Sequence, residues 1–520
     1  ELTDAPLLAR LGEEMRQAAQ QKWRAGPLIG GQPLAGPTQD ITNPANRRQV
    51  VGQVATTSPA QLEDAVSRAT RAQVSWAQLP VAERAGCLER AADLMETRQA
   101  ELMALCIKEA GKTLADALAE LREAVDFCRY YAARARLDFA EPQRLPGPTG
   151  ERDEIALTGR GVFLCISPWN FPLAIFTGQV VAALVAGNAV LAKPAEQTPL
   201  IAAAAVRLLH QAGVPGDVLH LLPGDGAAVG GTLVADERIS GVAFTGSVAT
   251  AKLINRALAA REGAIVPLIA ETGGQNCMIV DSTALPEQVV RDVLVSSFQS
   301  AGQRCSALRV LFLQEDVADK IEEMLAGAMR ELSVGDTASL SKDIGPVIDA
   351  EARANLLAHC QRMDKEARLI ARVELGSETE LGTFVAPVAY GIEALSQLTD
   401  EVFGPVLHVM RYQANKLDQV LADINGTGFG LTLGIHSRID STVDYIYRRL
   451  KVGNAYVNRN MIGAVVGVQP FGGEGLSGTG PKAGGPRYLH RFATERTLSI
   501  DTTAAGGNAS LMAMAEDLLF

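Results

Sequence analysis

Residues 161–194 read GVFLCISPWNFPLAIFTGQVVAALVAGNAVLAKP, and this stretch decides the fold. It begins with the strand-like run GVFLCIS, continues through a helical run near residues 175–186, and ends in a second apolar run, AVLAKP. The alternation continues with a helix at 200–212, the strand VLHLLPG, and VAFTGS leading into the helical segment ATAKLINRAL. Alternating strands and helices are typical of a parallel, doubly wound sheet. The stretch therefore predicts an α/β fold.

The pattern on both sides of this stretch extends the prediction. Downstream, IVPLIAET, CMIVD, a helix near 287–301, and VLFLQ before a helix at 317–332 predict a second α/β domain. Upstream, the helical period of three to four residues persists from about residue 59 to 136. The Gly- and Pro-rich stretch GPLIGGQPLAGPTQD, which follows a polar amphipathic helix, predicts a linker. The stretch EPQRLPGPTGERDEIALTGRG predicts an extended arm.

Length and composition exclude several classes of protein. A chain of 520 residues is too long for one hydrophobic core, so we expect two or three domains. The net charge of −11 argues against a nucleic-acid partner, because no basic surplus exists to neutralise phosphates. No run of eighteen apolar residues or signal-peptide pattern appears. The seven cysteines are scattered without a CxxC pair, which favours neither disulfides nor zinc and fits a reducing cytoplasm.

One of the seven cysteines lies in a setting that suits a nucleophile. In FQSAGQRCSALR, Cys305 follows a small, polar, Gly-containing turn at the end of a predicted helix. A reactive thiolate needs a backbone that can approach the substrate and nearby amides that stabilise charge. A lone cysteine is more often an inert buried side chain, and the other six are interpreted in that way. Cys305 is therefore the candidate nucleophile only because of the motifs that accompany it.

Two further motifs supply a candidate base and a candidate hydrogen-bond donor. Glu271 ends an apolar strand in ETGGQN, where Gly273 and Gly274 let the chain turn tightly and leave the carboxylate in a cleft. Asn170 lies between two aromatic residues in SPWNFPL, and its side-chain amide could donate to a developing oxyanion. Taken separately, a strand-ending glutamate is usually a surface charge and an Asn before Phe-Pro is usually a turn residue.

A phosphate-binding position is also predicted. LLPGDGAAVGG does not meet the G-x-G-x-x-G fingerprint, since one residue too many separates its second and third glycines. FTGSVATAK is the better candidate, because Gly246 and Ser247 lie where a strand ends and a helix begins. Free N–H groups and the helix dipole at such a position suit a pyrophosphate.

Together these segments resemble the aldehyde dehydrogenase superfamily. The superfamily carries its nucleophile on a Gly-Gln-x-Cys core and its general base on a Glu-x-Gly-Gly segment about thirty residues earlier; here Glu271 lies 34 positions before Cys305. The resemblance implies that Cys305 is the nucleophile, that Glu271 is the base, and that Asn170 and the Cys305 amide hold the oxyanion. The chain departs from many relatives at Thr272 and Gln275, where they have Leu and Lys, and at Ala251, where they have Gly. None of these changes removes a proposed functional group.

The resemblance also implies NAD as cofactor. It assigns the adenine ribose hydroxyls to Lys193 and Glu196 in KPAEQTP, and the nicotinamide ribose to Glu401 in EVFGPVL. The remaining cofactor-binding residues that it implies are Gly246, Ser247, Phe403 and Trp169. A carboxylate at Glu196 would accept a hydrogen bond from a 2′-hydroxyl but repel a 2′-phosphate, so we expect NAD rather than NADP.

The resemblance is strongest with the L-glutamate γ-semialdehyde (Δ1-pyrroline-5-carboxylate) dehydrogenases, including the C-terminal module of bifunctional proline utilisation A, and it covers nearly the whole chain. It implies that Ser306 and the backbone amides of Gly463 and Ala464 hold the substrate carboxylate. It further implies that Phe171 and Phe471 sandwich the aliphatic chain and that Glu123 lies near the substrate amine. These choices are physically coherent, because a hydroxyl and two amides can bind a carboxylate and a carboxylate can hold an ammonium.

The expected architecture follows from the same resemblance: a Rossmann-type NAD-binding domain, an α/β catalytic domain and an oligomerisation arm. We place the N-terminal helix and linker at 1–35, the NAD-binding domain at 36–273 with the arm at 140–160, and the catalytic domain at 274–460. Residues 461–520 return to the NAD-binding domain and supply an oligomerisation segment and a C-terminal tail that would dock on a partner subunit. We expect a homodimer or a higher oligomer.

The expected reaction is the NAD-dependent oxidation of L-glutamate γ-semialdehyde to L-glutamate, through a Cys305 thiohemiacetal and thioester, as the second step of proline catabolism. Another semialdehyde dehydrogenase stays open, of the succinate, methylmalonate or coenzyme-A-acylating type. A non-redox cysteine hydrolase would need a histidine partner, and none of the six histidines lies in a Gly-flanked motif. The combination of Cys305, Glu271 and Asn170 opposes a non-catalytic scaffold. The sequence leaves open whether a proline dehydrogenase half, with FAD and a membrane-surface attachment, belongs to the full-length protein.

Overall fold

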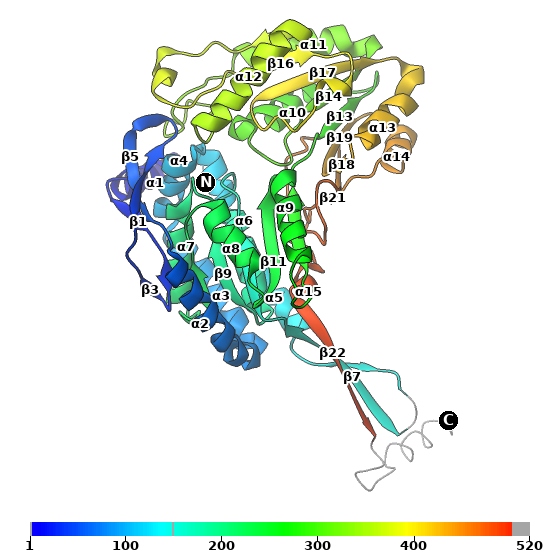
Figure 1. The fold of residues 1–520 in the computed structure, drawn as a ribbon. Helices are drawn as coiled ribbons and strands as arrows, with labels where there is room; N and C mark the ends of the chain where they lie inside the picture. Colours follow the sequence, from blue (N-terminus) through cyan, green and yellow to red (C-terminus); the bar gives the residue numbers. More distant parts are fainter. Residues whose placement is uncertain (1–2, 148–149, 502–520) are drawn as a thin grey trace.

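Two seven-stranded sheets organise the computed structural model, which describes residues 3–147 and 150–501 (Figure 1). The first has the order β12-β11-β8-β9-β10-β2-β3. Its five parallel strands are β8 (Val162–Ile166), β9 (Ala189–Lys193), β10 (Leu219–Leu221), β11 (Ile239–Gly246) and β12 (Leu268–Thr272). The strand-and-helix alternation therefore predicted this parallel sheet correctly.

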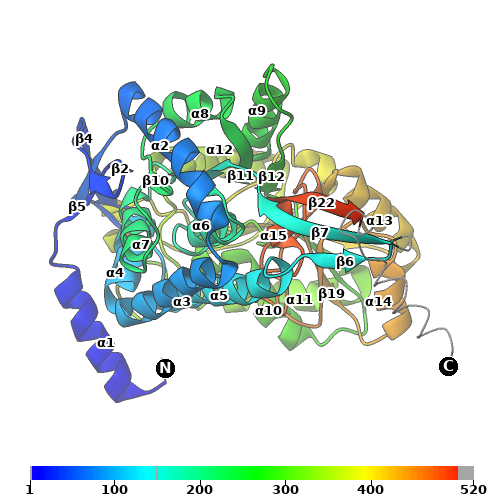
Figure 2. The same cartoon turned by 90° about the horizontal axis from the view of Figure 1, so that it is seen from below.

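The longer helices that accompany this sheet are α2 (Pro59–Gln78), α3 (Val81–Thr97), α4 (Gln99–Ala110), α5 (Leu114–Asp138), α6 (Ala174–Val185), α7 (Pro199–Gln211) and α9 (Val248–Ala259) (Figure 2). α6 contacts both β8 and β9 and is covered in turn by α3 and α5. This position buries α6 almost completely, which explains why its sequence is apolar all round. No helix within the described ranges has the length and apolar content that crossing a membrane requires.

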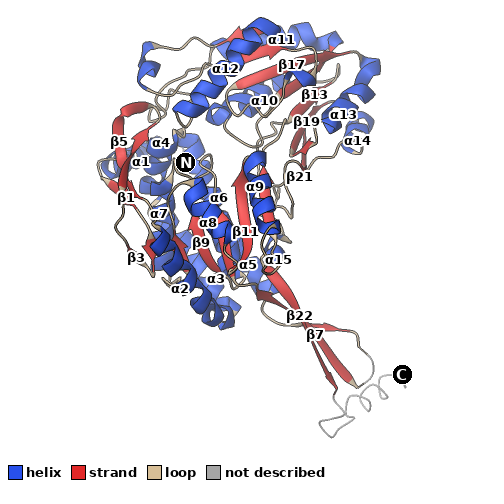
Figure 3. Cartoon of the chain, in the orientation of Figure 1, coloured by secondary structure: helices blue, strands red, loops and turns tan. Residues whose placement is uncertain are grey.

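The second sheet has the order β15-β16-β17-β14-β13-β19-β20 and a hydrophobic core of its own. Its parallel strands are β13 (Cys277–Val280), β14 (Val310–Gln314), β16 (Val388–Gly391), β17 (Val406–Tyr412), β19 (Thr432–His436) and β20 (Asn454–Val457), while β15 (Arg368–Arg372) is antiparallel. The accompanying helices are α10 (Pro286–Phe298), α11 (Glu315–Arg330), α12 (Ala350–Glu366), α13 (Leu417–Gly426) and α14 (Asp440–Tyr447). Helices α10, α11 and α12 lie beside the strands of this sheet (Figure 3).

A three-stranded antiparallel sheet projects from the body of the molecule (Figure 1). It consists of β6 (Gln143–Leu145), β7 (Glu151–Gly159) and β22 (Ala493–Asp501), with β7 in the middle. The arm expected at 140–160 is therefore an extended structure, completed by a strand from near the end of the chain. The expected C-terminal tail lies outside the described residues.

Two sequence-based expectations need correction. The Gly- and Pro-rich stretch predicted as a linker contains β2 (Leu28–Ile29) and β3 (Gln32–Pro33), a short hairpin that extends the first sheet beyond β10. The strand in IVPLIAET, with which the second strand-and-helix repeat began, is β12, and it pairs with β11. It therefore closes the first sheet instead of opening the second.

The fully buried Asn188 forms hydrogen bonds to three segments that pack around the first sheet. Its Oδ1 accepts hydrogen bonds from the backbone N–H groups of Arg160 and Gly161, at 2.7 and 3.1 Å. Its Nδ2 donates to the carbonyls of Ala183 and Phe492, at 3.0 and 2.9 Å. One side chain thus links the base of the arm, the end of α6 and the returning C-terminal segment.

We predict that Asn188→Ala lowers the free energy of unfolding by roughly 3 kcal/mol, because four backbone groups lose their buried partner. Thermal unfolding followed by circular dichroism measures this loss, with Asn255→Ala, an exposed position on α9, as the control. If the two variants unfold at the same temperature, Asn188 does not have this linking role.

Candidate active site

The residues of the candidate site lie at one edge of the first sheet. β12, β11, β8 and β9 are neighbours and run parallel, so their carboxyl ends meet at the same edge. Glu271 lies at the end of β12, Gly246 ends β11 and is followed by Ser247, Asn170 follows β8, and Lys193 ends β9. Ligands of open α/β sheets bind at this edge. Four motifs that are separated in the sequence are therefore brought together by strand pairing alone.

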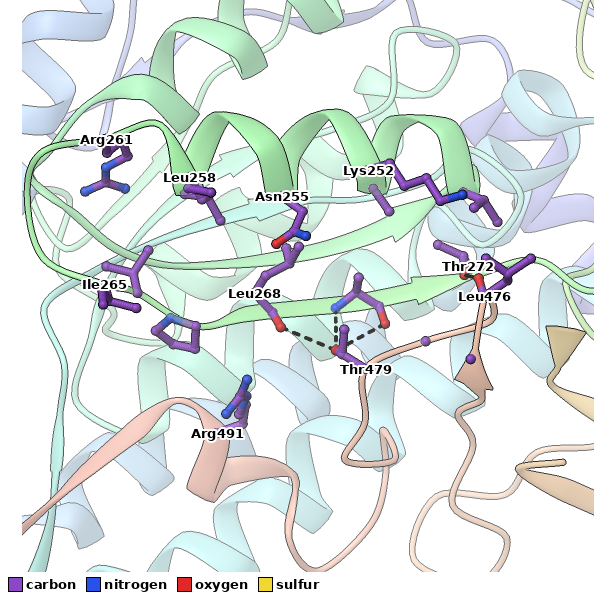
Figure 4. A pocket seen from close by; sticks show the side chains of 18 of the residues that line it. Lys252, Asn255, Leu258, Arg261, Ile265, Leu268, Thr272, Leu476, Thr479 and Arg491 are labelled. Carbon is purple, nitrogen blue, oxygen red and sulfur yellow. Dashed lines mark hydrogen bonds between the residues drawn. The ribbon is translucent and has the colours of Figure 1, made fainter. Parts of the chain in front are cut away.

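The strand that carries Glu271 is fixed on its outer side by a segment from far along the chain. Thr272 donates its N–H to the carbonyl of Ser477 at 3.1 Å, and Thr479 donates its N–H to the carbonyl of Ala270 at 2.9 Å. The Thr479 hydroxyl accepts the N–H of Ala270 at 2.9 Å (Figure 4). Between α9, β12 and this segment lies a groove of about 680 Å³, and none of the predicted site residues lines it (Figure 4).

A separate cavity of about 440 Å³ contains the predicted chemistry. It is lined by the predicted nucleophile and base, Cys305 and Glu271. All of the predicted substrate-binding residues also line it, namely Glu123, Phe171, Ser306, Gly463, Ala464 and Phe471. These residues come from both sheets' surroundings and from the segment that follows β20, so the cavity lies where the two halves meet.

Cys305 follows a turn with unusual backbone geometry. Ser300, Ala301 and Gly302 all have positive φ, at 55°, 53° and 66°. The left-handed region costs a non-glycine residue about 1–2 kcal/mol, so the surrounding contacts must hold this turn. A Cβ at Gly302 would lie 2.1 Å from the carbonyl oxygen of Gly404, which only glycine avoids. The conformation of the turn is therefore held by close packing against the residues around it.

The ionisation of the two central groups is shifted by their surroundings. Burial raises the pKa of the Cys305 thiol to about 12, with a further contribution from the carboxylates of Glu401 and Glu271. Burial likewise raises the pKa of Glu271 to about 8, although the charge of Lys482 partly counteracts it. All seven cysteines lie in the described part of the chain, and Cys305 is the one that is not fully buried. A carboxyl with a pKa near neutrality suits proton transfer.

Asn170 and a residue that the sequence did not single out hold the nucleophile's backbone. Asn170 donates one Nδ2 hydrogen to the carbonyl of Gln303 at 3.2 Å, which leaves its second N–H available as a donor. Asn276 donates to the carbonyls of Cys305 and Ala307 at 2.6 and 2.9 Å. Asn276 belongs to the same ETGGQN motif as Glu271, so that motif contributes to both the base and the nucleophile.

Three of the predicted cofactor residues lie close to the nucleophile turn. The rings of Trp169 and Phe403 meet edge to face at 5.5 Å, and Glu401 pairs with Arg309 at 3.3 Å. Arg309 is fully buried and also donates to the carbonyls of Gly302 and Arg304, at 2.7 and 3.0 Å. Sequence reasoning missed Arg309, although a charge at the start of the apolar run VLFLQ was a visible signal.

The other predicted cofactor residues lie at the ends of β9 and β11. Lys193 Nζ lies 3.7 Å from Glu196 Oε1, which also accepts the N–H of Gly226 at 2.7 Å. Gly226 belongs to LLPGDGAAVGG, so the stretch that failed the fingerprint still contacts a predicted ribose-binding residue. Ser247 caps α9 by accepting the Thr250 N–H at 3.2 Å, and the first amides of a helix have no partner within it. A Cβ at Gly246 would lie 2.6 Å from the Phe244 ring.

The end of the cavity at α5 carries charged groups. Burial raises the pKa of Glu123 to about 7, and the nearby Glu120 adds to the rise. Lys112 Nζ lies 4.1 Å from the centre of the Phe171 ring and 3.4 Å from Glu120. Glu123 therefore becomes a carboxylate near neutral pH, at a position where an ammonium group could pair with it.

Comparisons with known proteins agree with this geometry. The aldehyde dehydrogenase family model matches residues 33–498. The bifunctional protein PutA of Escherichia coli is 51% identical over 504 residues, which cover 95% of this chain but 37% of that protein. The 1-pyrroline-5-carboxylate dehydrogenase of Geobacillus kaustophilus is 37% identical, with 91% of this chain and 92% of that protein covered. The chain thus spans little more than a third of that bifunctional relative.

Solved structures give the same result. A crystal structure of Bradyrhizobium japonicum proline utilization A matches with a TM-score of 0.87 and 54% identity, covering 96% of this chain and 47% of that one. The 1-pyrroline-5-carboxylate dehydrogenase of Thermus thermophilus matches with a TM-score of 0.92 and 34% identity, covering 96% of this chain and 98% of that one.

Proposed function

Because the chain belongs to the aldehyde dehydrogenase family, we propose that it oxidises L-glutamate γ-semialdehyde to L-glutamate, with NAD as cofactor. The observation that carries this proposal is the cavity of about 440 Å³ that Cys305 and Glu271 line. A nucleophile, a base, a hydroxyl beside the nucleophile and a carboxylate all line it. An aldehyde that bears both a carboxylate and an ammonium would satisfy all four groups at once.

Each residue then has a definite task in the reaction. The Cys305 thiol, which burial keeps protonated, gives its proton to water as its sulfur attacks the aldehyde carbon. The free N–H of Asn170 and the Cys305 amide stabilise the oxyanion of the thiohemiacetal. When bound, NAD supplies the hydride acceptor that converts this species to a thioester. Glu271 takes a proton from the attacking water, and hydrolysis releases L-glutamate. Separating oxidation from hydrolysis is ordinary covalent catalysis.

The residues present suit a dinucleotide. The N-terminal turn of α9 offers amides to a pyrophosphate, and Gly246 keeps the approach to it free of a side chain. Glu196 is half exposed and held by Gly226, so that its carboxylate can accept from a ribose hydroxyl. Trp169, Glu401 and Phe403 would hold the nicotinamide end beside Cys305. A carboxylate at Glu196 would repel a 2′-phosphate, which supports NAD over NADP.

The wider context is part of the same proposal. Copies of the chain would pair through the arm of β6, β7 and β22 as a cytoplasmic homodimer or higher oligomer. Because the bifunctional relatives are much longer than this chain, a proline dehydrogenase half with FAD would accompany it in a protein of that kind.

The first prediction from this proposal tests the substrate. Ser306→Ala should raise KM for the semialdehyde by roughly tenfold, the value of one charge-assisted hydrogen bond of about 1.4 kcal/mol, and leave propionaldehyde oxidation nearly unchanged. The kcat/KM values for both aldehydes with both proteins decide this. Ser297→Ala, a buried serine that does not line the cavity, is the matched control. Equal losses on the two aldehydes would mean that Ser306 supports the nucleophile and not the carboxylate.

The second prediction concerns the base. Since the pKa of Glu271 is raised to about 8, its carboxylate form predominates only above that pH, and thioester hydrolysis should rise with pH and level off beyond it. Glu271→Gln should give one burst of NADH followed by near arrest, because hydride transfer precedes the attack of water. Stopped-flow absorbance between about pH 6 and 9 separates the phases. Cys305→Ala, which should show no burst, is the control, and a missing burst in Glu271→Gln would give Glu271 an earlier role.

The third prediction concerns cofactor choice. Glu196→Gln should narrow the preference for NAD over NADP by about tenfold, because the repulsion of a 2′-phosphate is removed. The measurement is kcat/KM for each cofactor, with Glu237→Gln, an exposed glutamate of the same half, as the control. Equal use of both cofactors by the unaltered protein would contradict the ribose assignment.

A further inference from the structure

The turn that precedes Cys305 needs an external support. Its residues Ser300 and Ala301 hold left-handed backbone that non-glycine residues avoid. Inside the turn, the carbonyl of Ser300 accepts from the backbone N–H of Gln303 at 3.0 Å and from its Nε2 at 3.3 Å. The position of Cys305 therefore depends on what grips the turn from outside.

One carboxylate grips this turn at three points. Asp116 Oδ1 accepts from Gln299 Nε2 at 2.7 Å and from Arg304 Nη2 at 2.8 Å. Asp116 Oδ2 accepts from Ser300 Oγ at 2.9 Å. The three donors span the turn from its first residue to the residue immediately before Cys305. Asp116 thus ties the start of the turn to its end, while Arg309 binds the carbonyls of Gly302 and Arg304.

Asp116 is itself held rigidly. It lies in the first turn of α5, where its N–H donates to the hydroxyl of the N-cap Thr113 at 3.1 Å, and it is 2% exposed. α5 packs in the core of the first sheet, whereas the turn follows α10 of the second. The contact therefore fixes the turn before Cys305, which belongs to the second half, to helix α5 of the first half.

Arg304 connects Asp116 to the nucleophile, because it binds this carboxylate and directly precedes Cys305 in the chain. Its guanidinium is almost fully buried, donates to Ser300 Oγ through Nε at 3.3 Å, and lies 5.3 Å from the Phe171 ring. Burial opposes the charge of Asp116, but Arg304, Lys112 and the donors Gln299 and Ser300 outweigh it and hold the pKa of this carboxyl below its usual value. Asp116 is thus ionised at neutral pH, when its acceptor role is needed.

We propose that Asp116 is a positioning residue for the reaction: it holds the turn 299–304 so that the Cys305 thiol and amide face the aldehyde. The inference rests on the proposed function, because it takes Cys305 as the nucleophile. Asp116 does not line the cavity, so it acts through the turn and not on the substrate. Its loss should slow the step that Cys305 performs without weakening cofactor binding.

The test is Asp116→Asn in the full chain. An amide keeps the shape of the side chain but presents two N–H groups to donors, so part of the grip is lost. The rate of the single-turnover NADH burst with glutamate γ-semialdehyde should fall at least tenfold, and kcat should fall with little change in KM. The dissociation constant for NAD, from quenching of intrinsic fluorescence, should stay within twofold.

Asp281→Asn is the matched control. Asp281 is a buried aspartate at the end of β13 that also accepts from three donors, Thr283 N–H, Thr283 Oγ1 and Ser437 Oγ, and it does not line the cavity. We expect it to lower the thermal unfolding temperature while leaving the burst rate within twofold. A burst in Asp116→Asn within twofold of the unaltered protein, or an equal loss in Asp281→Asn, would overturn the inference.

Two further outcomes are decisive. If Asp116→Asn does not fold, Ser300→Ala removes one donor and leaves the carboxylate in place; a burst at least threefold slower supports the inference, and an unchanged burst overturns it. If the unaltered protein gives no burst with the semialdehyde, the proposed function fails, and the inference fails with it. A normal burst in the unaltered protein together with an unaffected Asp116→Asn overturns the positioning role alone.

Discussion

The parallel register of β12, β11, β8 and β9 is the constraint on which the site depends. Thr245 lies opposite Glu271 across one pair of strands, and Ile166 lies opposite both Phe244 and Lys193 across the next two. This register aligns the strand ends, so the base, the oxyanion donor and the ribose-binding residues reach one edge together. A slip of one residue would turn Glu271 and Lys193, which lie within their strands, to the other face of the sheet. The proposed chemistry therefore depends first on the strand register, because the register decides where each site residue lies.

Much of the fold was predictable because its signals are local. The period of apolar residues changes where helices give way to strands, and the helices from about residue 59 to 136 followed that period. The hairpin of β2 and β3 was missed because strands of two residues show no period at all. The membership of β12 was missed for another reason: parallel pairing joins segments distant in sequence, and nothing within IVPLIAET specifies its neighbour.

The candidate site shows the same division between features with local signals, which could be predicted, and features that depend on distant contacts, which could not. Short motifs, together with the resemblance to a known family, predicted Cys305, Glu271 and the substrate-binding residues, and all of these residues line one cavity. Asp116 could not be found in this way, since it meets Arg304 across 188 positions and looks like any charge in the first turn of a helix. The raised pKa values of Glu271 and Glu123 also arise from burial, which only the assembled halves provide.

The segment at 476–479 has a consequence for how the molecule is made. β12 obtains its outer partner from Thr479, and 209 positions separate Ala270 from that residue. During synthesis the first sheet is therefore left with an open edge until the whole second sheet has been translated. Unpaired edges recruit other chains, and contacts this distant form slowly. The first sheet, although it comes earlier in the chain, is thus the one that is completed last.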